Sequence, residues 1–83
     1  MQNLQKGKFS ANIENSSLYV VTEDGTEILV DKDVEKIIKT EDSDYCYKVS
    51  YCKQGGRKAD LYYSKESNNY KIFIESKKHI FWD

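Results

Sequence analysis

The chain has 83 residues, of which 39% are hydrophobic and 33% charged, with a formal net charge of -1 at pH 7. This length accommodates a single domain, residues 1–83, and the apolar and aromatic content excludes an intrinsically disordered chain. No apolar run reaches the roughly 20 residues of a membrane-spanning helix, and the first residues lack the apolar core of a signal peptide. We therefore expect a cytoplasmic protein with no membrane partner.

The N-terminal part of the sequence predicts three strands. Lys8–Ile13 alternates apolar and polar residues as an edge strand does, and Glu14–Ser17 then reads as a turn. Leu18–Thr22 and Glu27–Val30 flank a loop in which Asp24-Gly25 favours a type I′ turn. The resulting four-residue loop makes both faces of this hairpin apolar, which predicts that it is buried. The predicted pairs are Val21 with Ile28, Val20 with Leu29, and Tyr19 with Val30.

The next segment, Asp31–Lys39, changes period and predicts a helix of about two turns. Val34, Ile37 and Ile38 fall on one helical stripe, and Asp31 is a suitable N-cap. The five residues that follow, Thr40–Asp44, predict an acidic loop.

The C-terminal part predicts a three-stranded meander that starts at Tyr45. Strict alternation from Tyr45 to Cys52 indicates a strand, and the apolar pattern favours a three-residue loop Gln54–Gly56, with Gly56 in the left-handed conformation. The same reasoning predicts a four-residue loop at Glu66–Asn69. The predicted pairs are Tyr51 with Ala59, Val49 with Leu61, Tyr47 with Tyr63, Tyr63 with Ile72, and Leu61 with Ile74. The predicted outer face carries one row of Lys48, Tyr62 and Phe73 and another of Ser50, Asp60 and Glu75.

Three strands, a short helix and three strands predict an α+β fold class, mostly antiparallel β. This βββ-α-βββ order forms a curved sheet, a small sandwich or an open barrel with one short helix.

Several kinds of chemistry find no support in the sequence. Cys46 and Cys52 lie about 20 Å apart on one side of a predicted strand, whereas a disulfide needs Cα atoms about 5.5 Å apart, so we expect two reduced thiols. His79 is the only histidine, which leaves no zinc ligand set and little basis for a nucleophile and base pair. The acids at alternate positions from Asp31 lack the spacing of a calcium loop. We therefore expect neither an enzyme nor a cofactor.

Charge is divided unevenly along the chain. Residues Glu23 to Asp44 contain nine acids and three lysines, whereas the rest contains ten basic residues and five acids. Such separation produces opposed surface potentials that steer charged partners. We expect the acidic block to contact a protein partner, such as a basic nucleic-acid-binding surface. Its predicted contact residues are Glu23, Asp24, Asp31, Asp33, Glu35, Glu41, Asp42 and Asp44.

Two functional hypotheses follow. The first is a small non-catalytic protein-binding module, an inhibitor or regulator, which uses the acidic block or the outer sheet face. Its size and residue usage also fit a phage or mobile-element product that blocks a host nucleic-acid-acting or defence enzyme by nucleic-acid mimicry. The alternative is a single-stranded nucleic-acid-binding β domain in which Tyr62 and Phe73 stack on bases. The side chains that track phosphates in this alternative are Lys48, Arg57, Lys58, Lys71 and Lys77.

The oligomeric state stays open between a monomer and a homodimer. In the homodimer, the N-terminal edge strand Lys8–Ile13 pairs with a second copy.

Overall fold

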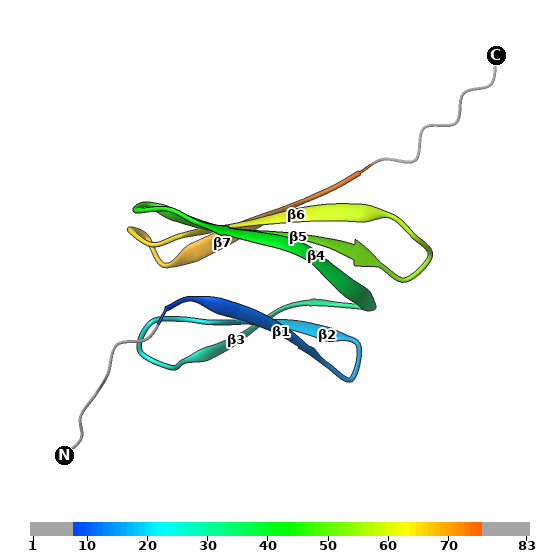
Figure 1. Ribbon diagram of the computed structural model, residues 1–83, viewed down its shortest axis with the longest axis horizontal. Helices are drawn as coiled ribbons and strands as arrows, with labels where there is room; N and C mark the ends of the chain where they lie inside the picture. Colours follow the sequence, from blue (N-terminus) through cyan, green and yellow to red (C-terminus); the bar gives the residue numbers. More distant parts are fainter. Residues whose placement is uncertain (1–7, 76–83) are drawn as a thin grey trace, which may run out of the picture.

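The protein is an antiparallel β-sandwich over the residues that the structure describes. The computed structural model describes residues 8–75 and has seven strands there, in one three-stranded and one four-stranded sheet (Figure 1). The predicted α+β fold class is therefore wrong, because residues 8–75 form no helix and the fold is all-β. The strands are β1 (Ser10–Glu14), β2 (Ser17–Val21), β3 (Glu27–Lys32), β4 (Val34–Asp42), β5 (Cys46–Lys53), β6 (Lys58–Ser64) and β7 (Asn69–Ile74).

Strands that are consecutive in the chain are neighbours in both sheets, in the orders β1-β2-β3 and β4-β5-β6-β7. The chain crosses from one layer to the other at Asp33, between β3 and β4 (Figure 1). Two backbone hydrogen bonds hold this crossover: Val34 N–H donates to the Ser16 carbonyl at 2.9 Å, and Gln54 N–H donates to the Asp33 carbonyl at 2.8 Å. The start of β4 is thereby fixed to turns of both sheets.

The core lies between the two layers. Apolar residues at alternate positions give β2, β5 and β6 one apolar face each, and these faces point inward. The Phe9 ring adds to this core by stacking on Tyr47, with the ring centroids 5.5 Å apart. The buried hydrophobic residues are Leu18, Val20, Val30, Val34, Tyr47, Val49, Tyr51, Ala59, Leu61 and Tyr63.

The N-terminal edge strand and the turn after it are confirmed. β1 is the outermost strand of its sheet, and Glu14 pairs with Ser17 across a two-residue turn. Asn15 and Ser16 form this turn with φ angles of 53° and 61°. Two consecutive positive φ angles are the geometry of a type I′ turn.

The hairpin of β2 and β3 has the predicted strands but not the predicted register. Thr22 N–H donates at 2.9 Å to the carbonyl four residues later, which closes a three-residue loop where Gly25 alone has a positive φ, 90°. A type I′ turn needs two such residues, so the predicted turn type is wrong. The shorter loop shifts the register by one residue, which turns Val20 and Ile28 inward and leaves Leu29 exposed. The predicted burial of both faces is therefore also wrong.

The segment predicted as a helix, Asp31–Lys39, forms the end of β3, the crossover and most of β4. β4 pairs with β5 through two register irregularities, one after Val34 and one after Ile37. Each bulge adds one residue to β4. The residues of β4 that pair with the inward-facing side of β5 are therefore three positions apart, where a regular strand would have them two apart. Val34, Ile37 and Thr40 follow this spacing, which resembles the period of a helix. Their β-branched side chains favour the strand.

The turn between β5 and β6 is as predicted. Lys53 N–H donates to the Arg57 carbonyl at 2.7 Å, and Gly56 has a φ of 89°. This three-residue loop sets the predicted register. The confirmed pairs are Tyr51 with Ala59, Val49 with Leu61, and Tyr47 with Tyr63.

The pairing of β6 with β7 differs from the prediction by two residues. The loop spans residues 65–68, because Ser64 pairs with Asn69, and Leu61 consequently pairs with Ile72. A shift of two residues is one full period of a strand, so each side chain keeps its predicted face. What changes is which residues are neighbours across that face.

Candidate functional site

The acidic residues predicted as a contact surface do not come together in the structure. Those nearest the start of the block lie at the β2–β3 turn, whereas the crossover after β3 lies at the opposite end of the sandwich (Figure 1). The block is therefore divided between two sheets and both ends of the molecule. Glu23 and Asp24 lie in the β2–β3 turn, Asp31 on β3, Asp33 at the crossover, Glu35, Glu41 and Asp42 on β4, and Asp44 between β4 and β5.

Several of these acids also have partners inside the chain. Asp42 forms an ion pair with Lys65, and Glu41 forms one with Lys39 at 3.1 Å. The hydrogen bond and charge of Lys39 lower the pKa of Glu41. Asp24 accepts a hydrogen bond from the Thr22 hydroxyl, which lowers the pKa of Asp24. The two ion pairs reduce the net charge that the block presents to a partner, whereas Asp24 keeps its full charge.

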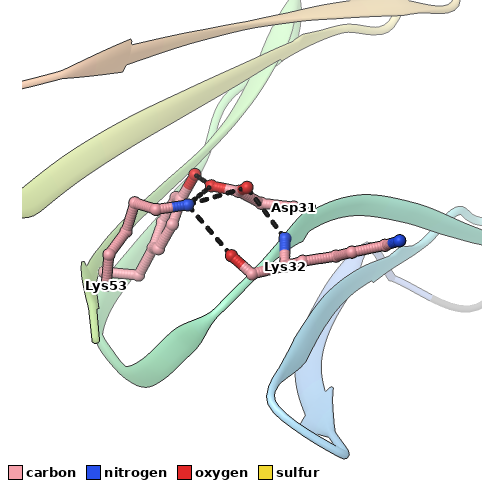
Figure 2. Close-up of polar contacts among 4 residues, drawn as sticks. Asp31, Lys32 and Lys53 are labelled. Carbon is pink, nitrogen blue, oxygen red and sulfur yellow. Dashed lines mark hydrogen bonds and ion pairs between the residues drawn. The ribbon is translucent and has the colours of Figure 1, made fainter.

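The most enclosed of the acids is Asp31, which joins the two sheets (Figure 2). Its carboxylate accepts hydrogen bonds from the Tyr51 hydroxyl at 2.7 Å and from Lys53 Nζ at 2.9 Å to each oxygen. Lys53 Nζ also donates to the Lys32 carbonyl at 2.9 Å, and Lys32 N–H donates to Asp31 at 2.8 Å. The side chains of Lys53 and Asp31 are only 13% and 17% exposed.

The titration behaviour of this cluster follows from its geometry. Partial burial would raise the pKa of Asp31, but hydrogen bonds from Tyr51 and Lys53 outweigh it and hold the pKa below its ordinary value. Burial, reinforced by the hydrogen bond to Asp31, raises the pKa of Tyr51 far above its ordinary value. The cluster is thus a neutral phenol and an ion pair, each satisfied by the others. We interpret it as a structural link between the sheets.

The outer face of the four-stranded sheet exposes apolar and basic side chains together. Ile38, Tyr62 and Phe73 on this face are 48%, 37% and 58% exposed. Part of it is hollowed into an open groove of about 540 Å³. The groove is lined by Ile38, Lys39, Lys48, Ser50, Lys58, Ala59, Asp60, Phe73, Ile74 and Glu75.

The two aromatic side chains predicted for this face are brought together, though not in the predicted row. Tyr62 stands between Lys48 and Lys71, whereas Phe73 stands opposite Asp60. The rings of Tyr62 and Phe73 are therefore diagonal neighbours, 5.7 Å apart between centroids at an interplanar angle of 75°. Such an edge-to-face pair is a favourable aromatic arrangement.

Lysine is the residue that gives this face its charge. Lys48 Nζ lies 5.4 Å from the centroid of the Tyr62 ring, within cation–π range. The neighbouring Tyr62 side chain and, after it, the carboxylates of Asp60 and Glu41 raise the pKa of Lys48, so this lysine is a cation at neutral pH. Among residues 8–75, Lys48, Lys58 and Lys71 form no ion pair.

The acids on the same face are engaged locally. Asp60 accepts a hydrogen bond from the Ser50 hydroxyl at 2.9 Å, and Glu75 accepts one from the Lys58 backbone N–H at 3.4 Å.

The groove lined by Ile38 was not predicted, because this residue was assigned to a helix. The β-branched run in β4 was the signal that could have identified a strand there, which would have placed Ile38 on an edge strand of the same sheet as Tyr62 and Phe73.

The cysteines and the potential metal ligands were the other candidate residues of the sequence. Cys46 and Cys52 are free thiols, and residues 8–75 contain no group of three metal-ligating side chains. His79 and Lys77 lie outside the described residues. No helix in residues 8–75 is long and apolar enough to cross a membrane.

Comparison with protein-family models, with curated proteins and with solved structures gave no match to this chain.

Proposed function

We propose that this protein is a non-catalytic protein-binding module that contacts its partner with the outer face of β4–β7. The observation that carries the proposal is the exposure of Ile38, Tyr62 and Phe73 beside a groove rimmed by lysines. Exposed aromatic and aliphatic side chains interspersed with polar and charged ones are a feature of surfaces that bind other proteins. A module of this kind acts on its partner by occupying a surface, as an inhibitor or a regulator does.

Charge complementarity defines the partner. Lys48, Lys58 and Lys71 have no ion pair among the described residues, whereas Asp60 and Glu75 already accept hydrogen bonds on the face. The fitting partner is a protein surface that places an apolar side chain against Phe73 and carboxylates against these lysines. This proposal replaces contact through the acidic block, since the block is divided between both ends of the sandwich.

The same face supports nucleic acid binding less well. Lys48 lies over the Tyr62 ring and Phe73 packs against Tyr62 edge to face, so both neighbours compete with a base for that ring. A stacking platform needs free ring faces along a basic groove. A protein partner is therefore favoured, with a cytoplasmic location in keeping with two free thiols.

The proposal is tested by affinity capture with three purified baits. The first is the wild-type protein, and the second carries Phe73→Ser and Lys48→Glu on the outer face. The third, a matched control, carries Tyr19→Ser and Leu29→Ser. Tyr19, which is half-buried, pairs with the exposed Leu29 on the outer face of the other sheet. Captured proteins are identified and purified, and their affinity for each bait is measured by titration. Circular dichroism verifies that all three baits are folded.

A captured acidic protein that binds the wild type and the control, and binds the Phe73 and Lys48 variant at least tenfold more weakly, supports the proposal. Equal binding to all three baits refutes it. In parallel, labelled single-stranded DNA and RNA are titrated at about 50 and 200 mM salt, where phosphate contacts change affinity steeply. Salt-sensitive binding that disappears in the outer-face variant would assign the face to nucleic acid instead.

A further inference from the structure

The outermost strand of the four-stranded sheet, β7, has no neighbour on its open side in residues 8–75. It pairs with β6 in one regular register, whereas β4, at the other edge of the sheet, has two irregularities. Bulges, short length and charged residues are the means by which edge strands avoid pairing with other chains. β7 has only Lys71 in this role, within the sequence Asn69–Ile74.

The inner face of β7 is incompletely covered. Tyr70 and Ile74 pair with the buried residues Tyr63 and Ala59, so they point toward the layer between the sheets. They are nevertheless 38% and 44% exposed. The opposing sheet has one strand fewer, and this difference leaves β7 overhanging. Apolar side chains are thus exposed on both faces of an open edge.

The backbone groups along this edge follow from the pairing with β6. Glu75 N–H donates to the Lys58 carbonyl at 2.9 Å, so odd-numbered residues of this segment direct their hydrogen-bonding groups toward β6. Antiparallel pairing alternates, so Tyr70, Ile72 and Ile74 direct their N–H and C=O groups to the open side. These three residues can bond to another strand without disturbing β6.

We propose that β7 pairs antiparallel with β7 of a second copy of the chain, with Ile72 on the two-fold axis. In this register Tyr70 faces Ile74 of the partner subunit, and Lys71 faces Phe73 of the partner subunit. Asn69 faces Glu75 of the partner subunit. Apolar residues therefore meet on the inner face, a lysine meets an aromatic ring on the outer face, and no like charges oppose each other.

Self-pairing fits because, when two copies of β7 run antiparallel, apolar residues face apolar residues and the lysine faces an aromatic ring. Moving the axis to Lys71 would set two lysines opposite each other. The other regular edge strand, β1, is less suited because it lies against β4, at the edge where the sheets approach each other (Figure 1). Pairing through β7 also aligns the outer faces of both copies in one continuous sheet.

The test measures association by sedimentation equilibrium up to about 0.5 mM, because a contact through one pair of short edge strands belongs with the small and weak specific interfaces. Three variants accompany the wild type. Tyr70→Lys with Ile74→Lys places like charges opposite each other. Tyr70→Lys with Ile74→Glu places opposite charges there. Ser10→Lys with Asn12→Lys adds the same charge as the first variant, but on β1.

The proposal requires a wild-type dimer, at least tenfold weaker association of the double-lysine β7 variant, and restored association of the lysine–glutamate variant. The β1 variant must associate like the wild type. A monomeric wild type, an unaffected double-lysine β7 variant, or failure of the lysine–glutamate variant to recover overturns it. Loss of association in the β1 variant alone would assign the dimer to the N-terminal edge strand. The outer face exists on each copy, so a negative result leaves the proposed function standing.

Discussion

Replacing Asp31 by asparagine tests whether the enclosed ion pair holds the two sheets together. The carboxylate accepts hydrogen bonds from Tyr51 and Lys53 across the layers and one from the Lys32 backbone. Asp31→Asn keeps the shape of the side chain but removes its charge. The variant leaves Lys53, whose side chain is 13% exposed, as a cation without a counter-charge.

The expected cost is about 2–3 kcal/mol of unfolding free energy. Breaking a fully buried ion pair by removing one partner costs roughly 3–5 kcal/mol, and the remaining exposure of this pair reduces that figure. For a domain of this size, 1 kcal/mol shifts the melting temperature by about 4–8 °C. Asp31→Asn should therefore lower the melting temperature by roughly 10–20 °C.

Urea denaturation at several pH values separates the charge from other effects of the substitution. Hydrogen bonds keep the pKa of Asp31 below its ordinary value of 3.8 in the folded protein. The contribution of the Asp31 carboxylate to the unfolding free energy is therefore complete above that value, and it is lost as the pH falls through the folded-state pKa. The difference between wild type and Asp31→Asn should be constant from about pH 5 to 8 and should shrink below about pH 4.

The double variant Asp31→Asn with Lys53→Met provides the internal control. It removes the unpaired cation, and its stability should recover to within about 1 kcal/mol of the wild type. A cost below about 0.5 kcal/mol for Asp31→Asn alone would refute the structural role, since that is the effect of an ordinary surface substitution. A double variant as unstable as the single one would show that the charge is not the cause.

Two further predictions concern local features of the fold. The pKa of Tyr51 is raised by burial and by Asp31, so wild-type stability should be complete below pH 10, the ordinary phenol value, and fall above it. Tyr51→Phe should reduce the unfolding free energy at neutral pH by about 1–2 kcal/mol. The variant should also lack the part of the alkaline decline that is due to Tyr51, and urea denaturation at pH 7 and 11 measures both effects. Ser16 has a φ of 61° in the turn after β1, so Ser16→Gly should raise stability by roughly 0.5–1 kcal/mol in thermal melts. A destabilised Ser16→Gly variant would contradict the account of this turn.

The features that were predicted correctly depend on neighbours in the sequence. The register of β5 and β6 followed from Gln54–Gly56 and from strict alternation on both sides, because loop length and side-chain period determine the pairing together. The β2–β3 hairpin lacked this agreement, since its strands are apolar at consecutive positions. A loop of three residues therefore gives pairs as plausible as those of the predicted four-residue loop. One residue of loop length decided whether Leu29 was buried.

The β4 segment shows why part of the candidate site could not be predicted. Its two bulges depend on pairing with β5, and they convert the two-residue period of a strand into the three-residue spacing of Val34, Ile37 and Thr40. A helix gives nearly the same spacing, so periodicity alone does not distinguish them. β-branched residues favour the strand, but propensity is weaker evidence than period.

The fate of the acidic block follows from the same strand. A helix and a loop between Asp31 and Asp44 would have gathered the acids at one end of the domain. β4 instead runs the length of the sheet, and it carries Glu35 and Asp42 away from each other toward opposite ends. The charge asymmetry of the sequence is thereby divided in space, and part of it is used in ion pairs with Lys39, Lys53 and Lys65. A charge run along a chain predicts a charged surface only when the backbone between the charges turns back on itself.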